Sequence, residues 1–155
     1  MRKLSLTEWA ALSEIIGTAA IVFSLVFVTF SINQNTAVMQ ASSENVLYEL
    51  QFARVRDIVS NPGVASIYVK RNRNEKLSEE EQLRFHWDKI QELETWNIAF
   101  SRHRDGLFST VRWEAWNNYY VTEVTNQFPA ESWAEARNWY PEDFQRHVDA
   151  VYAIK

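Results

Sequence analysis

An uncharged, apolar run near the N-terminus is the strongest feature of the hydrophobic pattern. No charged residue occurs from Ile15 to Ser43, and the stretch from Ile15 to Ile32 holds only four polar residues, all with a hydroxyl group. A helix needs roughly 17–25 apolar residues to cross the hydrocarbon of a bilayer, and hydroxyl groups can bond to carbonyl groups of the preceding turn. A buried helix of a soluble protein would show a polar stripe, which this run lacks. The pattern therefore predicts a transmembrane helix.

A cleaved signal peptide is the alternative interpretation of this run. Arg2 and Lys3 resemble the basic start of such a peptide, but acidic residues also precede the run. Asn35-Thr36-Ala37 and Met39-Gln40-Ala41 match a cleavage site poorly, so we predict an uncleaved single-pass anchor. After Lys3 the next basic residue is Arg54, and the positive-inside rule then places the N-terminus in the cytoplasm and the following domain outside.

The residues after the apolar run follow a helical pattern. Ser5 with Glu8, and Ser78 with Glu81, have the spacing of capping boxes, so helices are expected to begin at Leu6 and Glu79. Nothing breaks the first helix before Asn61-Pro62-Gly63, which predicts a stalk that continues from the anchor. The stalk carries two apolar rows, Val46, Leu50 and Ala53 in one and Tyr48, Phe52, Val55 and Val59 in the other. Two rows on different faces indicate a helix covered by neighbours on more than one side.

Five further helices are expected. The predicted ranges are Pro62–Val69, Glu79–Arg104, Thr110–Asn126 and two shorter helices that open at Pro129 and Pro141 and end near Tyr140 and Ile154. The apolar side of the longest is expected at Leu83, Trp87, Ile90, Leu93, Asn97 and Phe100. We therefore predict an all-α fold, with a transmembrane helix that continues into a stalk and then a small antiparallel helical bundle. The predicted division is 1–37 for the anchor with its flanks and 38–155 for the stalk and bundle.

Composition excludes several classes of site. With three glycines, neither a phosphate-binding loop nor a dinucleotide fingerprint can be built, and without cysteine there is no disulfide or thiol catalysis. The net charge is −4 and the basic residues are spread along the chain, which disfavours nucleic-acid binding. The cluster from Lys70 to Lys76 contains Glu75, so a solvated connector is favoured over a lipid-headgroup site.

The three histidines are the first candidates for chemistry. His86, His103 and His147 have no partner at metal-ligand spacing. Asp143 and His147 are four residues apart, which is more typical of a surface salt bridge than of a catalytic pair. We expect no enzyme, and no catalytic, metal-binding or cofactor-binding residue.

Aromatic residues and small residues indicate binding instead. The chain has seven Trp, six Tyr and nine Phe, which at helical spacing favours core packing over a ligand pocket. Small residues recur on one face of the spanning helix, where backbones can approach closely, and an amide follows at its end. The predicted packing interface is Ser13, Gly17, Ala20, Ser24, Ser31 and Asn35.

Several short motifs together resemble a large family of uncharacterised bacterial single-pass membrane proteins. They are Glu14-Ile15-Ile16-Gly17, Gln34-Asn35-Thr36, Asn61-Pro62-Gly63, Gly106-Leu107-Phe108 before Trp113 and Trp116, and the tail residues Trp133, Arg137, Tyr140, Phe144 and Val148. The resemblance covers nearly the full length and implies the same anchor and bundle in a bacterial inner membrane, but no activity. Members often have a basic residue just before the Q-N-T element, where this chain has Asn33.

The sequence thus predicts a non-catalytic, membrane-anchored accessory or scaffold protein. Its expected partners are membrane lipid and, through the spanning helix, a second copy or another integral membrane protein. The alternative is a small-molecule or lipid sensor with an aromatic pocket lined by Trp87, Trp96, Trp113 or Trp116. An enzyme that uses Asp143 and His147 is the third possibility.

Overall fold

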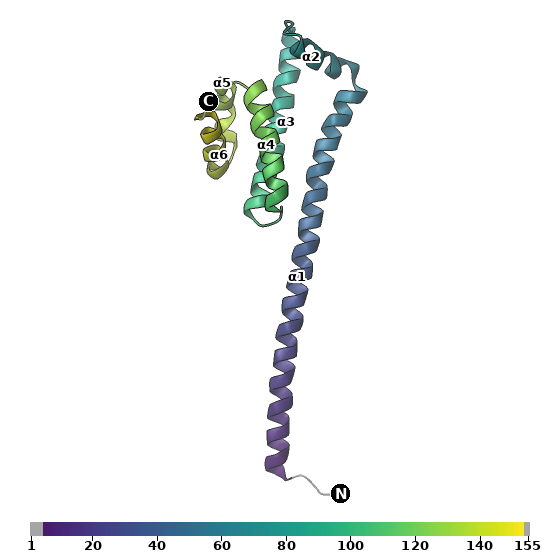
Figure 1. Cartoon of the computed structure of the whole chain (residues 1–155), viewed down its shortest axis with the longest axis vertical. Helices are drawn as coiled ribbons and strands as arrows, with labels where there is room; N and C mark the ends of the chain where they lie inside the picture. Colours follow the sequence, from purple (N-terminus) through teal and green to yellow (C-terminus); the bar gives the residue numbers. More distant parts are fainter. Residues whose placement is uncertain (1–4, 154–155) are drawn as a thin grey trace. The chain divides into compact units, whose positions relative to one another are not determined.

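The protein is all-α over the residues that its structure, a computed structural model, describes (5–153), as predicted. The chain divides into two compact units, residues 1–39 and 40–155. Figure 1 labels the helices. They are α1 (Leu6–Ser60), α2 (Pro62–Asn72), α3 (Glu79–Arg104), α4 (Thr110–Gln127), α5 (Ala130–Ala136), the 3₁₀ turn η1 (Arg137–Trp139) and α6 (Glu142–Ala153). Arg2, Lys3 and the predicted helix end at Ile154 lie outside the described residues.

The first unit contains the beginning of α1. The capping box that predicts its start is confirmed, because the Glu8 amide donates to Ser5 Oγ at 3.3 Å and the Ser5 amide to Glu8 Oε2 at 2.7 Å. The hydroxyl groups of the apolar run bond to carbonyl oxygens four residues earlier, as for Thr29 with Leu25 at 2.9 Å. Of the helices described, α1 is the one long and apolar enough to cross a membrane. Its large side chains here are exposed within the chain itself, Phe23 by 75%.

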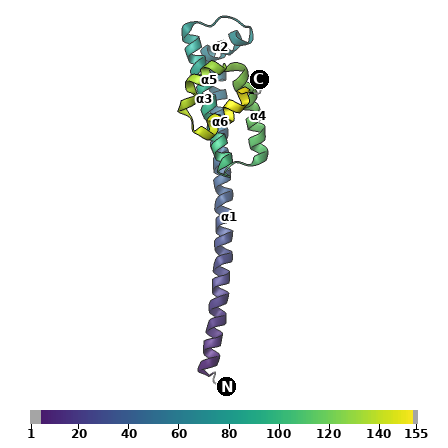
Figure 2. The same ribbon diagram turned by 90° about the vertical axis from the view of Figure 1, so that its left-hand side faces the viewer.

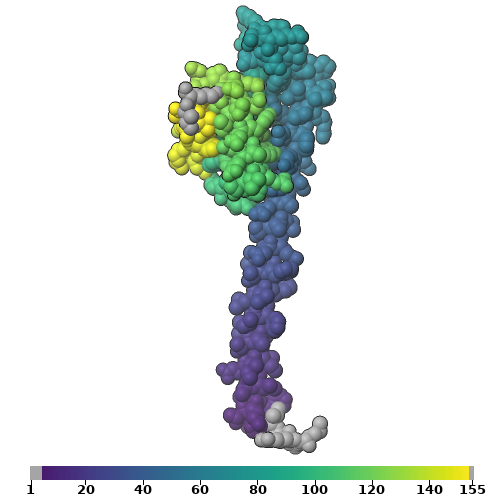
Figure 3. Space-filling view, in the orientation of Figure 1, coloured from purple at the N-terminus to yellow at the C-terminus, as the bar shows by residue number. Residues whose placement is uncertain are grey.

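The second unit is built on an antiparallel pair, α3 and α4 (Figures 1 and 2). The turn between them uses Gly106 at a φ of +73°, a conformation that side chains other than glycine rarely adopt. Helix α6 packs on both members of the pair, and Figure 3 shows it, in yellow, against the green α4. The predicted antiparallel bundle is confirmed.

Aromatic rings fill the core of this bundle. Trp96, Phe108 and Phe144 are at most 2% exposed, and the Trp96 ring meets Phe144 edge-on with 5.5 Å between ring centroids. Such rings bury large areas in a small domain, which lets about 100 residues form a closed core. The core thus joins α3, α4 and α6 in one cluster of buried side chains.

Two boundaries differ from prediction. Helix α2 ends at Asn72 rather than Val69, so the first residues of the expected connector are helical. Lys70 and Arg71 then lie in its last turn, where cations complement the helix dipole. Near the C-terminus, α5 ends at Ala136 rather than near Tyr140, and the chain continues as the turn η1.

The buried side of α3 also differs from prediction. Leu83 and Trp87, expected in the core, are 59% and 55% exposed, whereas Lys89 and Glu92 are each 1% exposed. The apolar spacing was therefore misleading for the first half of the helix. The physical reason is that Lys89 and Glu92 compensate each other within α3, and Arg54 of α1 adds a second cation beside Glu92.

The stalk prediction was wrong about which side of α1 is covered. In the second unit α1 buries Ser43 and Leu47 and half-buries Arg54, along the strip between the two apolar rows. Apart from the half-buried Tyr48, both rows remain exposed, Val46 by 41% and Phe52 by 62%. Polar side chains attach the covered strip to the bundle: Gln40 Nε2 donates to the Gly106 carbonyl at 2.8 Å, and Glu44 pairs with Arg112 at 3.0 Å. These directional contacts decide which strip faces the bundle.

Candidate functional site

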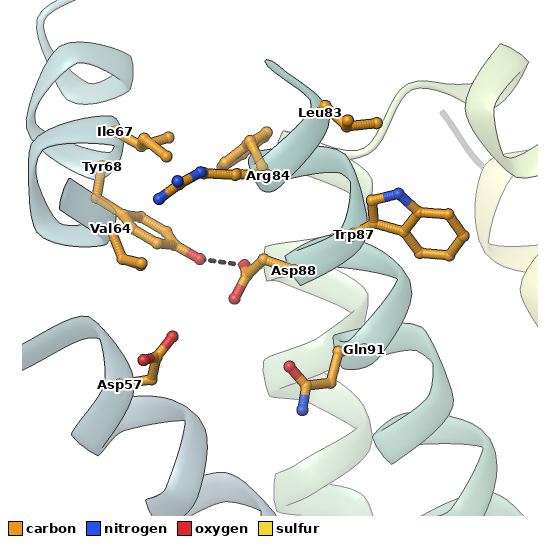
Figure 4. Close-up of a pocket in the computed structure, with 10 residues that line it drawn as sticks. Asp57, Val64, Ile67, Tyr68, Leu83, Arg84, Trp87, Asp88 and Gln91 are labelled. Carbon is orange, nitrogen blue, oxygen red and sulfur yellow. Dashed lines mark hydrogen bonds between the residues drawn. The ribbon is translucent and has the colours of Figure 1, made fainter. Parts of the chain in front are cut away.

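A pocket of about 430 Å³ opens in the second unit, between the end of α1, α2 and the first half of α3 (Figure 4). Its size is within the range of small-molecule sites. Its walls are mainly apolar and its floor is polar. The lining residues are Asp57, Val64, Ile67, Tyr68, Leu83, Arg84, Phe85, Trp87, Asp88 and Gln91.

Local capping positions the wall that α2 contributes. Asn61 Oδ1 accepts from the amides of Gly63 and Val64 at 3.1 and 3.4 Å, so α2 begins directly after α1 ends. Along α2, Ile67 is 2% exposed and Tyr68 lies next to it, facing α3. The sharp connection therefore places a tyrosine hydroxyl opposite the acidic residues of α3.

An ionic network forms the polar floor and joins three helices. Arg54 of α1 donates to both carboxylate oxygens of Asp88, from Nε at 3.1 Å and from Nη2 at 3.2 Å. The same Nη2 donates to the Tyr68 hydroxyl at 2.6 Å, and that hydroxyl donates to Asp88 Oδ2. Two-pronged contacts between a guanidinium and a carboxylate are both strong and geometrically specific. The network therefore sets the spacing of α1, α2 and α3.

A second ion pair lies deeper in the same network. Lys89 Nζ is 2.6 Å from Glu92 Oε2, and each side chain is 1% exposed. The other oxygen, Glu92 Oε1, has no hydrogen bond of good geometry but lies 2.8 Å from Arg54 Nη2. Lys89 Nζ also lies over the rings of Tyr68 and Phe85, at 5.3 and 5.1 Å from their centroids. Two cations thus face two carboxylates, as burial of charges requires.

Burial shifts the titration of these groups. The pKa of Glu92 is raised by burial, against the opposing effect of the Lys89 and Arg54 charges. The pKa of Tyr68 is raised above its usual range, first by burial and then by the hydrogen bond to Asp88. A raised phenol pKa keeps the Tyr68 hydroxyl protonated, so it remains a donor to Asp88 at neutral pH.

Two polar side chains of the lining have no polar partner among the described residues. Within residues 5–153, the carboxylate of Asp57 makes no hydrogen bond or ion pair, and neither does the amide of Gln91. Arg84 donates from Nη2 to Glu80 at 2.8 Å. Asp57 is therefore the charged group of the lining that no described side chain compensates.

The aromatic pocket considered from sequence is largely a packed core. Trp96, Trp113 and Trp116 are at most 9% exposed. All three belong to the same cluster of buried core residues. Trp87 does line the pocket, and its ring stacks on Trp139 with an angle of 10° between the planes. One of the four tryptophans is thus placed at a cavity.

The suggested pair of Asp143 and His147 does not form. Asp143 pairs with Arg104, and its Oδ1 accepts from the Phe144 amide at 2.9 Å. His147 Nε2 lies 2.8 Å from Asn117 Oδ1, and burial lowers the pKa of its ring. Each residue has a different structural partner, so the interpretation as a pair was wrong, both as a surface salt bridge and as a catalytic dyad.

The predicted packing residues of the anchor lie on one face of α1. At about 100° per residue, Ser13, Gly17, Ala20, Ser24, Ser31 and Asn35 fall within an arc of about 60°. Ser13 and Ser24 satisfy their hydroxyls within the helix, by bonds to the Trp9 and Ala20 carbonyls at 2.9 and 2.8 Å. A Cβ added at Gly17 would meet no atom within 4 Å. The face is therefore smooth and unoccupied within the described chain, and its use as an interface stays a prediction.

Sequence reasoning did not identify the ionic network. Its members are Arg54, Tyr68, Asp88, Lys89 and Glu92. The spacing of Lys89 and Glu92 by three residues was visible, but such pairs usually lie on solvated surfaces. Their burial depends on α1 and α2, which the local pattern does not show.

Comparison with known proteins adds no assignment to this geometry. The chain matches no protein-family model, no curated protein and no solved structure.

Proposed function

We propose that this protein is a non-catalytic, membrane-anchored scaffold that docks a second copy of itself. The anchor is the first part of α1, in a bacterial inner membrane, with the N-terminus in the cytoplasm and the bundle outside. Length, apolarity and exposure of α1 support the anchor. The resemblance in layout supports the bacterial membrane.

The exposed apolar row on α1 in the second unit is the observation that carries the proposal. Phe52, Val55 and Val59 are 62%, 45% and 78% exposed, at steps of three and four residues. Contiguous exposed apolar surface on a protein usually marks an interaction site. The row continues at its N-terminal end into Tyr48, which packs against the bundle core. The contact of Tyr48 with the core therefore fixes the position of the row. The outward side of the row remains uncovered by the rest of the described chain.

A second copy is the occupant that fits this row best. Copies that insert with the same orientation present the row in parallel and at the same depth, so the row can meet itself across a two-fold axis. On the outer surface of the same helix, Glu49 and Arg56 are in no ion pair among the described residues. In a two-fold contact, Glu49 of each copy can therefore pair with Arg56 of the other. The small-residue face of the anchor would let the spanning helices approach closely in the same dimer.

The test is the mass of the full-length protein in nanodiscs, by native mass spectrometry. We expect a dimer that weakens about tenfold or more in Phe52→Ser/Val59→Ser, because each lost side chain contributes roughly 1.5–3 kcal/mol of burial. Gly17→Leu/Ser24→Leu should weaken it as well. Ala19→Leu, on the opposite side of the anchor, and Val111→Ser, 79% exposed on α4, are the matched controls.

Three outcomes would contradict this function. A monomer at every protein-to-lipid ratio would exclude self-docking, and a different membrane protein recovered in fixed ratio would then identify the partner. Unchanged association in both double variants would exclude the two faces. Equal weakening by the controls would show that the effect is nonspecific.

The pocket favours a second candidate function, ligand sensing. A cavity with apolar walls and an unused carboxylate is a better ligand site than the packed tryptophan core. Such a role needs no chemistry beyond binding, and it is compatible with either oligomeric state.

A further inference from the structure

The charges around the pocket balance except for one. In the floor, Arg54 and Lys89 face Asp88 and Glu92, so two cations meet two anions. Arg84, whose side chain extends from α3 toward α2 in Figure 4, pairs with Glu80 through Nη2. Asp57 alone of the charged lining residues has no partner among residues 5–153. Asp57 is therefore the one unpaired charge among the described residues that line the pocket.

The geometry leaves the Asp57 carboxylate as an unpaired acceptor in the pocket. Figure 4 shows the Asp57 carboxylate directed into the space between α2 and α3, with the Gln91 amide below Asp88. The Tyr68 hydroxyl is already committed to Asp88, and Arg54 to Asp88 and Glu92. A ligand would thus find the Asp57 carboxylate, which accepts hydrogen bonds, and the Gln91 amide, whose oxygen accepts and whose nitrogen donates. Of the Arg84 guanidinium, Nη2 is already bonded to Glu80.

The apolar walls of the pocket favour a ligand that carries an apolar part beside its charged group. Val64, Leu83 and Trp87 line the opening, and Leu83 and Trp87 are more than half exposed although their side chains are apolar. Covering such side chains is favourable in proportion to the area removed from water. The rings of Tyr68 and Phe85 already face the Lys89 ammonium, so recognition of a cation here relies on Asp57 rather than on those rings.

From these features we propose that the pocket between α1, α2 and α3 binds a small organic cation, an amine with an apolar body. Its ammonium group pairs with Asp57 and donates to Gln91, and its apolar part lies against Leu83 and Trp87. An anion of the same shape meets the Asp57 carboxylate instead, and the Arg84 cation is already paired with Glu80. This binding site goes beyond the docking function and does not depend on it.

Three probes of similar shape test which ligand charge the pocket prefers: 2-phenylethylamine is a cation, 2-phenylethanol is neutral and phenylacetate is an anion. Equilibrium dialysis of the full-length protein in nanodiscs, against empty nanodiscs, corrects for partition into lipid. We expect saturable binding of the amine, about tenfold weaker binding of the alcohol and weaker still of the acid, since a hydrogen bond to a charged group contributes at least this factor. No saturable binding of the amine, or equal binding of the acid, would overturn the proposal.

Two variants test the location. Asp57→Asn should weaken amine binding about tenfold or more and leave alcohol binding unchanged, because only the charge is lost. Glu114→Gln removes the same charge at an exposed position of α4, outside the pocket lining, and should leave amine binding unchanged. Leu83→Trp fills the opening from an exposed position and should weaken amine and alcohol alike. Unchanged amine affinity in Asp57→Asn, or in Leu83→Trp, would place the binding elsewhere and refute this site.

The two proposals fail separately. A monomer that binds the amine through Asp57 would refute self-docking and retain the cation site. A dimer whose pocket takes no amine would do the reverse.

Discussion

Replacing Lys89 with methionine should destabilise the second unit strongly, whereas replacing Lys89 and Glu92 together should not. Methionine matches the length of the lysine stem but removes the ammonium group 2.6 Å from Glu92. The Glu92 carboxylate, 1% exposed, would then rely on Arg54, which also serves Asp88. Breaking a buried pair costs about 3–5 kcal/mol, and we expect about 3 kcal/mol here because Arg54 remains.

The double variant Lys89→Met/Glu92→Met removes both charges and leaves Arg54 opposite Asp88. Its loss should be about 1 kcal/mol or less, because a well-packed apolar pair can replace a buried ion pair at little cost. The double-mutant cycle should therefore give a coupling of at least about 2 kcal/mol between the two positions. Glu92→Met, the second single variant, should also be destabilised, since it leaves the Lys89 ammonium buried.

The assay is urea unfolding of the full-length protein in nanodiscs, followed by tryptophan fluorescence. The pH dependence supplies an independent check. In the native chain the Lys89 charge opposes the rise that burial causes in the pKa of Glu92. Lys89→Met removes that opposing charge, so the pKa of Glu92 should rise further. A raised pKa means that the destabilisation is fully present above it and is relieved as the pH falls and the carboxyl group takes up a proton. A double variant as unstable as the sum of the two single variants would refute the reasoning about compensated charge.

Two further predictions concern the bundle. Phe144→Ala should lower the free energy of unfolding by about 3–5 kcal/mol, because the ring is fully buried. Trp139→Ala, at a ring that is 60% exposed, should lower it far less. Similar losses in urea unfolding would contradict the assigned core. The second concerns acid: Arg137 and Trp133 donate to Asp149 and hold the pKa of its carboxyl group below the usual value. Their contribution should be present above the ordinary aspartate pKa and lost as the pH falls through the lowered one, so Asp149→Asn should flatten the acid limb of a stability–pH curve.

Several parts of this fold follow from local sequence alone. The capping box of Ser78 and Glu81 and the Asn61-Pro62-Gly63 break place helix ends within a residue or so, because caps act over one helical turn. The apolar run from Ile15 to Ile32 identifies the helix able to span a membrane, because transfer into hydrocarbon depends on composition and length. Such features need no knowledge of what lies far away in the chain.

Other parts depend on contacts between distant segments. Leu83 and Trp87 have the spacing of a core face, yet Lys89 and Glu92 are buried in their place. Burial of a charge is unfavourable unless partners compensate it, and the partner Arg54 lies more than thirty residues earlier in the chain. The pocket beside this network also depends on contacts between distant segments, because α1, α2 and α3 all line it.

The sequence by itself determined the helices, their caps and the apolar anchor, since these depend on interactions between near neighbours. Only the tertiary structure decided which strip of α1 and which side of α3 are covered, and with them the position of Asp57 at a pocket. The physical reason is that one helix can present several faces of similar apolarity. Long-range ion pairs and ring contacts then select the face that packs, and the remaining faces become available for binding.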